Sequence, residues 1–136
     1  MAFLTWSNEF STGVATYDGE HKQLIAMVND LHDSMMAGTA KSKLSKVLDG
    51  LITYTVEHFN HEERVLARHN YPGLAEHKHQ HELLKKQVQE FRAKAASGGG
   101  SHISIELLKF LKDWLLQHIQ KEDKKYGAFL NTNGVY

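Results

Sequence analysis

The chain of 136 residues contains no cysteine and only one proline. The absence of cysteine excludes disulfides, thiolate metal sites and cysteine nucleophiles, and it fits a reducing compartment. Lys and Arg together number 16, and so do Asp and Glu, which makes the formal net charge zero. A balanced charge provides no electrostatic surface for nucleic acid or an anionic membrane. We therefore expect neither of them as a partner.

Long apolar runs are also missing. No stretch approaches the roughly 20 apolar residues that a membrane-spanning helix needs. The first 16 residues contain polar and charged side chains, and they lack the basic start and apolar centre of a signal peptide. These absences predict a cytoplasmic protein without membrane contact. The length suits one domain with its own core, so we expect residues 1–136 to form a single domain.

Glycine and proline divide the chain into four long segments, at about residues 18–37, 42–69, 72–96 and 101–123. Within each segment apolar residues recur every three to four positions, which indicates amphipathic helices. Short connections between such helices predict an all-α fold, an up-down-up-down four-helix bundle. Residues 1–17 are apolar enough to pack along the bundle as an N-terminal arm. A short C-terminal helix is expected over residues 126–130.

Histidine is unusually frequent, with ten residues in the chain. Five of these histidines and one carboxylate continue the apolar stripes of the four predicted helices, and a second carboxylate, Asp123, follows the last of them. A buried imidazole or carboxylate is costly unless it is paired, hydrogen-bonded or bound to metal. Imidazole is also the commonest protein ligand for transition metals. The seven residues are His21, His58, Glu62, His77, His81, His118 and Asp123.

The positions of these residues relative to the expected turns place them at one depth of the bundle. With turns near residues 39, 71 and 99, candidates on adjacent helices lie at similar distances from the turn between them, within roughly one to two helical turns. That depth is nearer the end that carries the Tyr71-Pro72 turn. Seven donors exceed what one ion needs, and they suit two adjacent metal ions.

One residue does not fit this scheme on spacing alone. The candidate pairs on the second and third helices are four residues apart and share a helix face. His118 and Asp123 are five residues apart, which rotates Asp123 by about 140° on an ideal α-helix. Asp123 can therefore reach the site only if its helix is locally unwound or if its side chain approaches from the side.

The four motifs resemble those of the hemerythrin family, and in particular bacterial hemerythrin-like domains. Such domains occur alone or attached to signalling proteins such as chemotaxis receptors. The resemblance covers nearly the whole chain and includes the tryptophan near the start of the last motif. The motifs read Asp18-Gly-Glu-His21-Lys-Gln-Leu24, His58-Phe-Asn-His-Glu62-Glu, His77-Lys-His-Gln-His81 and Trp114-Leu-Leu-Gln-His118-Ile-Gln-Lys-Glu-Asp123.

The resemblance implies a non-haem di-iron centre, with two iron ions (Fe2+/Fe3+) joined by an oxo or hydroxo bridge. One iron would be held by His77, His81 and His118. The other would be held by His21 and His58, with the open position for dioxygen on that iron. Glu62 and Asp123 would bridge the two ions. By adjacency and family analogy, an apolar pocket around the oxygen would be formed by Leu24, Phe59, Trp114, Leu115 and Ile119.

The implied function is reversible dioxygen binding without catalysis, as an oxygen carrier or as an oxygen- or redox-sensing domain of a signalling parent chain. Two alternatives use the same residues: a di-iron enzyme that reduces peroxide, nitric oxide or oxygen, and a metal-storage protein. Zinc also accepts imidazole and carboxylate ligands, but two bridged ions with an open position fit iron better. The remaining histidines are expected to be surface or satisfied core groups: His32, His61, His69, His79 and His102.

Overall fold

The computed structural model describes residues 3–37, 41–94 and 100–136 of the chain. A short 3-10 helix, η1 (Asn8–Phe10), precedes four long helical segments. These are α1 (Ala15–Met36), α2 (Lys41–Arg68), α3 (Leu74–Lys94) and a fourth that consists of α4 (Gly100–Gln117), η3 (His118–Asp123) and α5 (Lys124–Thr132). The expected breaks near residues 39 and 99, and the expected helix end at residue 96, lie outside the described residues.

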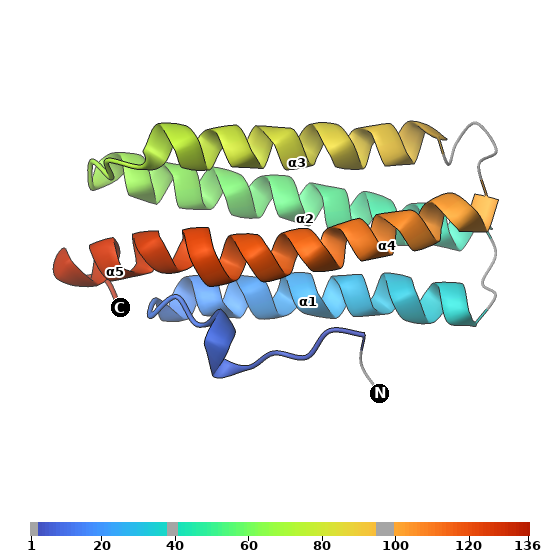
Figure 1. Ribbon diagram of the computed structural model, residues 1–136, viewed down its shortest axis with the longest axis horizontal. Coiled ribbons are helices and arrows are strands. Elements are labelled where there is room, and N and C mark those ends of the chain that lie inside the picture. The colour runs from blue at the N-terminus through green and yellow to red at the C-terminus, as the bar shows by residue number, and fades with distance from the viewer. Residues whose placement is uncertain (1–2, 38–40, 95–99) are drawn as a thin grey trace.

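The four segments run antiparallel to their neighbours and surround one core (Figure 1). α1 and α3 each pack against both α2 and α4, so every helix has two neighbours. This arrangement confirms the up-down-up-down bundle that the apolar periodicity predicts. The turn between α2 and α3, the start of α1 and helix α5 all lie at the same end of the bundle (Figure 1).

The N-terminal arm packs on the bundle, as its apolar composition predicts. The backbone of Leu4 exchanges two hydrogen bonds with the side-chain amide of Asn29 on α1, each 2.8 Å long. Leu4 and Phe10 are both buried in the core. At Leu4 the arm is therefore attached to α1 by hydrogen bonds, and along its length it is attached by apolar contact.

Helix α1 begins at Ala15, three residues before the start expected at residue 18. Asp18 consequently lies in the first turn of the helix and does not cap it. Its carboxylate accepts a 2.7 Å hydrogen bond from the Thr12 backbone N–H and a 2.6 Å hydrogen bond from the Ser11 hydroxyl. The additional turn is stabilised by packing, because it carries the buried ring of Tyr17.

Helix α2 ends in a turn that reverses the chain. Asn70 adopts a left-handed conformation with φ of 58°. The Tyr71 N–H donates to the Leu66 carbonyl at 2.9 Å, and the Asn70 N–H donates to the Ala67 carbonyl at 3.1 Å. This pair of bonds is the Schellman arrangement, which satisfies the last free carbonyls of a helix. Pro72 belongs to the turn, so α3 starts two residues after the position expected at Pro72.

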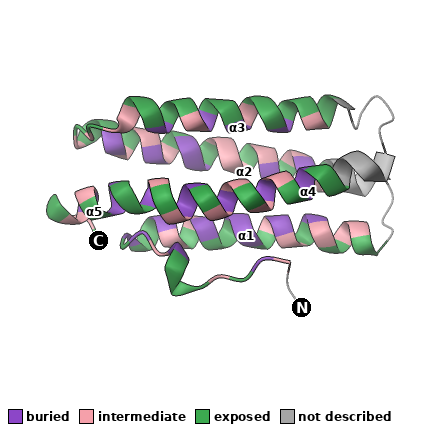
Figure 2. Cartoon of the chain, viewed as in Figure 1, coloured by how far each residue is buried: buried purple, intermediate pink, exposed green. Residues whose placement is uncertain are grey.

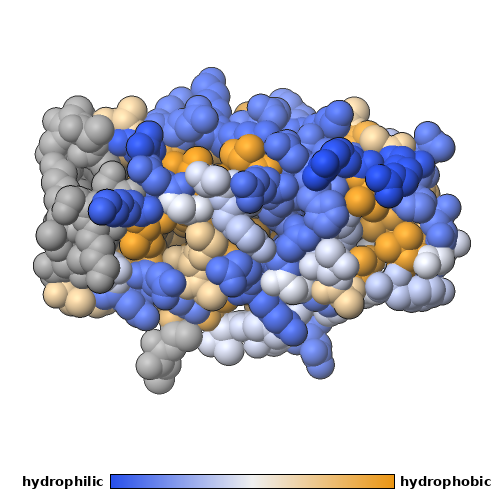
Figure 3. Space-filling model, turned by 180° about the vertical axis from the view of Figure 1, so that it is seen from behind, coloured by the Kyte–Doolittle hydropathy of each residue, from blue (hydrophilic) through white to orange (hydrophobic). Residues whose placement is uncertain are grey.

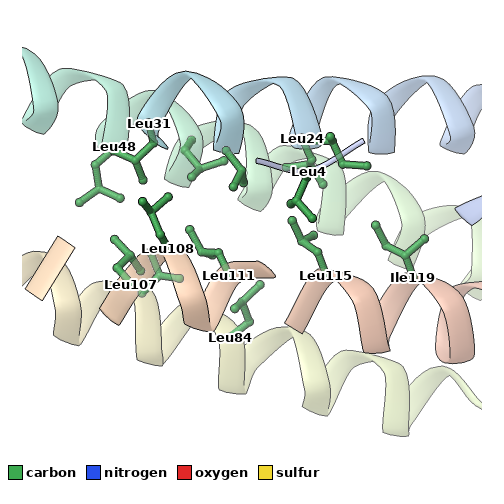
Figure 4. Packing of buried hydrophobic residues seen from close by; sticks show 14 of the residues in the cluster. Leu4, Leu24, Leu31, Leu48, Leu84, Leu107, Leu108, Leu111, Leu115 and Ile119 are labelled. Carbon is green, nitrogen blue, oxygen red and sulfur yellow. The ribbon is translucent and has the colours of Figure 1, made fainter. Parts of the chain in front are cut away.

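Leucine and other aliphatic side chains fill the space between the four helices. The buried residues face inward on every helix (Figure 2), and those of α1, α2, α3 and α4 meet along the bundle axis (Figure 4). Burying one such side chain stabilises the fold by about 1.5–3 kcal/mol. The buried members that Figure 4 labels are Leu4, Leu24, Leu31, Leu48, Leu84, Leu107, Leu108, Leu111, Leu115 and Ile119.

The C-terminal helix α5 continues the fourth helix instead of forming a separate element. The backbone at Gln117 and Lys124, on either side of η3, is helical, so α4, η3 and α5 form one rod (Figure 1). At its C-terminal end a second apolar cluster includes Tyr17, Leu66, Tyr126 and Leu130. This cluster closes the end of the bundle beside the α2–α3 turn.

The surface agrees with the amphipathic pattern of the helices. The face turned away from the viewer in Figure 1 is mostly hydrophilic, with small separate apolar areas (Figure 3). Within residues 3–37, 41–94 and 100–136, no helix combines the length and apolarity that crossing a bilayer requires.

Candidate metal centre

The seven polar residues that the sequence singles out converge at one level of the bundle. All seven are buried, and none of their side chains exceeds 4% exposure. α1 contributes His21, α2 contributes His58 and Glu62, α3 contributes His77 and His81, and η3 contributes His118 and Asp123. The level lies within about two turns of the end formed by the α2–α3 turn. The structure therefore brings all seven predicted residues together.

Glu62 lies at the centre of the group, and its two oxygens face different histidines. Oε2 lies 3.2 Å from His21 Nε2 and 2.9 Å from His58 Nε2. Oε1 lies 3.1 Å from His77 Nε2 and 3.3 Å from His81 Nε2. The carboxylate thus spans the space between two histidine groups.

Asp123 divides its oxygens in the same way. Oδ2 lies 3.0 Å from His21 Nε2, while Oδ1 lies 2.9 Å from His118 Nε2 and 3.4 Å from His77 Nε2. The two carboxylates are therefore oriented alike. One oxygen of each faces the histidines of α1 and α2, and the other oxygen faces the histidines of α3 and η3.

A π-helical turn brings Asp123 into the site. η3, residues His118–Asp123, is wound as a π-helix, in which backbone hydrogen bonds join residues five apart. Residues five apart then lie on nearly the same face, whereas an α-helix would separate them by about 140°. The local unwinding that the five-residue spacing requires is thus present, and it coincides with the segment that carries both side chains.

The inward-facing atoms fit two metal ions. One set of ligand atoms, from Glu62, His77, His81 and His118, lies within 4.8 Å of one another, and so does a second set from His21, His58 and Glu62. Among the described residues, His81 Nε2, His118 Nε2 and Asp123 Oδ1 are buried near polar neighbours but make no hydrogen bond of acceptable geometry. Buried polar atoms are rarely left unpaired. Nitrogen and carboxylate donors that are arranged in this way are suitable ligands for transition metals.

Outer hydrogen bonds hold three of the imidazoles with Nε2 directed inward. The Nδ1 atom of His58 lies 2.7 Å from Glu20 Oε1. That of His81 lies 2.9 Å from Glu63 Oε2, and that of His118 lies 2.9 Å from Gln80 Oε1. An acceptor at Nδ1 fixes the tautomer whose Nε2 is free to bind metal, and it raises the basicity of the ligand.

The carboxylates reverse the effect of burial on three of the histidines, His21, His58 and His77; for His77, burial lowers the pKa, but the hydrogen bond to Glu62 and the charge of Asp123 outweigh it and raise the pKa. Burial alone lowers the pKa of His21, but hydrogen bonds to Asp123 and Glu62 outweigh it and raise the pKa to about 9. Burial likewise lowers the pKa of His58, whereas the charge of Glu62 and the bond to Glu20 raise it to about 10. In His81 burial prevails, and its pKa falls below the ordinary value. Without metal, protons on His21 and His58 therefore balance the carboxylates.

Comparison with known proteins agrees with this geometry. Residues 12–130 match the family described as Hemerythrin HHE cation binding domain. The chain belongs to the hemerythrin family. It is 38% identical over 133 residues to the bacteriohemerythrin of Methylococcus capsulatus, which covers 97% of this chain and 100% of that protein. It is 31% identical over 125 residues to the myohemerythrin of Sipunculus nudus, with 92% of each chain covered.

The fold agrees with that of solved hemerythrins. A crystal structure of wild-type hemerythrin superposes with a TM-score of 0.84 at 37% identity, covering 93% of this chain and 97% of the other. The hemerythrin family uses a bridged di-iron centre, and this chain has the histidine, glutamate and aspartate cluster for it.

Apolar and aromatic side chains surround the hemerythrin centre. The ring of Phe59 stacks on His81 with centroids 3.7 Å apart, and Trp114 stacks on His118 at 4.1 Å. Both rings therefore contact the three-histidine group. Leu24, Leu115 and Ile119 are buried between α1 and the fourth helix (Figure 4). The oxygen-pocket role of these five residues stays a prediction.

Sequence reasoning missed the outer partners and Tyr126. The Tyr126 hydroxyl donates a 2.5 Å hydrogen bond to Glu62 Oε2, and its side chain is fully buried. Burial and the charge of Glu62 hold the pKa of Tyr126 well above its ordinary value, so the hydroxyl stays protonated. The sequence predicted only a short helix over residues 126–130, and its apolar pattern gave no sign of this hydroxyl contact. Glu20 and Glu63 adjoin His21 and Glu62 in sequence, which is the one signal that could have identified them.

We call the level of the bundle at which the seven candidate residues meet the ligand layer. The other described histidines lie outside it, as expected. His79 is exposed, and His32, His61 and His69 are partly exposed. The Nδ1 atom of His61 lies 2.7 Å from Glu20 Oε2, so His61 shares the carboxylate that orients His58. The side chain of His102 lies outside the described part of the chain.

Proposed function

We propose that this chain binds dioxygen reversibly at a non-haem di-iron centre. The observation that carries the proposal is that Glu62 and Asp123 each direct one oxygen to each histidine group. Two carboxylates shared in this way between separate sets of imidazoles suit a bridged pair of ions and exceed what a single ion needs. The proposed ligands are His77, His81 and His118 for one iron, His21 and His58 for the other, and Glu62 and Asp123 as bridges.

The ligand count leaves one position open. With both carboxylates and an oxo or hydroxo bridge shared, the iron held by three histidines would have six donors and the iron held by two histidines would have five. We therefore assign dioxygen to the iron that His21 and His58 hold. Ferrous ions held by these residues would supply the electrons that dioxygen binding requires.

The surrounding residues make this binding reversible. Glu20, Glu63 and Gln80 hold the imidazoles in the orientation that metal binding needs. The buried side chains beside the centre exclude water, which limits the side reactions of a reactive bound ligand. We infer that Leu24, Leu115 and Ile119 form this wall on the side of the open position, while Phe59 and Trp114 cover the three-histidine group.

The test combines metal analysis with an absorption spectrum. We expect two irons per chain, and we expect a visible band when oxygen is added to the reduced protein that disappears when oxygen is removed. One zinc per chain without a visible band contradicts the proposal. A band that decays at once into an irreversible oxidised spectrum favours the enzymatic alternative, and more than two metals per chain favours storage.

We infer that the whole chain acts as one domain and that it serves first as an oxygen carrier in the cytoplasm. The relatives are hemerythrins, among them the bacteriohemerythrin of Methylococcus capsulatus, which supports a carrier. The same centre would serve oxygen or redox sensing in a signalling protein, for example in chemotaxis. Sensing adds a requirement: oxygen binding must change the affinity for a partner, which a pull-down with and without oxygen measures.

A further inference from the structure

The two metal positions are not equivalent in their surroundings. Glu62 Oε2, which faces His21 and His58, also accepts the 2.5 Å hydrogen bond from the Tyr126 hydroxyl. Oε1 faces His77 and His81 on the other side. The hydroxyl therefore acts on one end of the carboxylate bridge, the end directed at the two-histidine position.

The Tyr126 hydroxyl is held firmly in place. Its ring contacts Tyr17 edge-on with centroids 5.4 Å apart, and it contacts His77 in the same manner at 5.3 Å. The next residue, Gly127, lies directly against the backbone of Thr12, where a Cβ would come within 1.8 Å of the carbonyl oxygen. Helix α5 thus cannot rotate away from Glu62 without separating from the N-terminal arm.

A hydrogen bond from an O–H group to a carboxylate oxygen withdraws electron density from that oxygen. Charge-assisted bonds of this kind are short and strong, and the oxygen becomes a weaker donor to metal. The two-histidine position also has fewer nitrogen ligands. Among the described residues, moreover, the buried Nδ1 of His21 has no hydrogen-bond partner, whereas those of His81 and His118 do.

One contact acts in the opposite direction. His58 has a carboxylate partner, Glu20, at 2.7 Å, which strengthens it as a ligand. Glu20 divides its charge between His58 and the half-exposed His61. The balance of these contacts favours tighter binding at the three-histidine position.

We propose that Tyr126 is a positioning residue that makes the two metal positions unequal, so that the ion held by His21 and His58 is the more weakly bound and exchangeable one. The hydroxyl fixes the carboxylate bridge and weakens its Oε2 end. The same effect favours the ferrous state of the ion on that side, because a less basic carboxylate stabilises ferric iron less. This inference rests on the proposed di-iron function.

The test measures iron release from the reduced, iron-loaded protein in the presence of a ferrous chelator. We expect two phases of one iron each. In Tyr126→Phe the faster phase should slow by roughly tenfold, the lower end of the effects that outer partners have on metal affinity, and the reduction potential should fall. Tyr17→Phe is the matched control, because it removes the hydroxyl of the neighbouring buried ring; both phases should stay unchanged.

A second variant keeps the test decisive if Tyr126→Phe does not hold iron. Site-specific 3-fluorotyrosine at position 126 keeps the hydroxyl and makes it a stronger donor, so it should speed the faster phase. Release in one phase from the wild-type protein, or a faster first phase in Tyr126→Phe, overturns the inference. The oxygen band recorded on the same sample separates the two hypotheses. A normal oxygen band together with release of both irons at one rate refutes this inference alone. Two phases of iron release without an oxygen band refute the oxygen function alone.

Discussion

Glu62 is the residue on which most contacts of the centre converge, since its oxygens face four imidazoles and the Tyr126 hydroxyl. Burial raises its pKa, but the positive charge of His58 and the hydrogen bonds from His21, His58 and His77 lower it well below the ordinary value. The side chain therefore stays ionised at neutral pH. An ionised, fully buried carboxylate is tolerated because its partners, or metal, compensate the charge.

Replacing Glu62 with Gln should abolish binding of the iron pair. The neutral amide removes a bridging charge and can present one oxygen only, so iron content should fall below one per chain by metal analysis. The control is Glu63→Gln at the adjacent position, which alters only the outer contact to His81. That control should weaken affinity by about 10–100-fold. Equal iron content in Glu62→Gln and the wild type would refute the bridging role.

Ile119 tests the role of the apolar wall. It is buried beside His118, with 1% of its side chain exposed. Ile119→Thr places a hydroxyl in the wall, and we expect the oxygen-bound form to oxidise about tenfold faster, the effect of roughly 1.4 kcal/mol on a barrier. Ile119→Val has nearly the same shape without the hydroxyl and is the matched control. Equal oxidation rates of the two variants in a stopped-flow or spectral decay measurement would exclude a pocket role.

Residues with regular spacing were predictable, and residues with tertiary partners were not. Six of the seven predicted ligand residues lie on the apolar stripes, where a polar side chain is conspicuous. Tyr126 lies in the short apolar segment over residues 126–130, where a buried aromatic ring needs no further explanation, so its hydroxyl contact could not be predicted from the sequence. Gln80 is a polar residue on a polar face, and its contact with His118 depends on how α3 and the fourth helix rotate against each other.

At the scale of elements, the π-turn η3 resolves the difficulty with Asp123. One extra residue between His118 and Asp123 is accommodated by a wider turn, and the helix continues in α5. The sequence showed that some departure from α-helical geometry was necessary. It did not show whether the helix would unwind or the side chain would approach from the side, because either arrangement is compatible with a spacing of five residues.

The junction between α5 and the N-terminal arm yields an element-scale prediction. Gly127→Ala would place a Cβ 1.8 Å from the Thr12 carbonyl oxygen, so backbone must shift. We expect the free energy of unfolding to fall by roughly 1–3 kcal/mol. Gly19→Ala, on α1 with no atom within 4 Å of the new Cβ, should instead raise it by roughly 0.5–1 kcal/mol. Urea denaturation measures both, and equal effects would contradict the close contact.

For the whole molecule, the ligand layer interrupts an otherwise apolar core with charge. Four helices must each turn a polar face inward at the same depth, and the layer is stable only when its charges balance. Metal ions balance them in the loaded protein. In the metal-free protein, protons on His21 and His58 do so, which links stability to pH.

The metal-free protein should therefore lose stability as pH rises. The folded pKa values of His21 and His58, about 9 and about 10, lie above the ordinary value of 6.5. The stabilisation that protonated His21 and His58 give the folded state is complete below about pH 6.5. It declines between about pH 6.5 and about pH 10, and it is absent at higher pH. Because the pKa values of Glu62 and Asp123 are lowered, stability also falls in acid, below their ordinary values of 4.5 and 3.8. Urea midpoints across pH measure this profile.

The iron-loaded protein is the comparison for that profile. With the proposed ligands, metal replaces the protons on His21 and His58, so binding at neutral pH should release protons and affinity should rise with pH. The loaded protein should resist urea better than the chelator-treated protein, and its stability should not decline between pH 7 and 9. Parallel profiles of the two forms would contradict the assignment of these histidines as ligands.

The sequence by itself predicted the bundle, the level of the proposed ligand layer and six of its seven members, because helical periodicity and the positions of polar residues within an apolar stripe are local properties of a chain. Only the tertiary structure decided how the layer is organised. Packing between helices determines which carboxylate oxygen faces which imidazole. It also places Glu20, Glu63 and Gln80 beside the outer nitrogens of the histidines, and it brings the Tyr126 hydroxyl within hydrogen-bond distance of Glu62. These contacts join residues far apart in the chain, and their geometry depends on helix rotation that no spacing specifies.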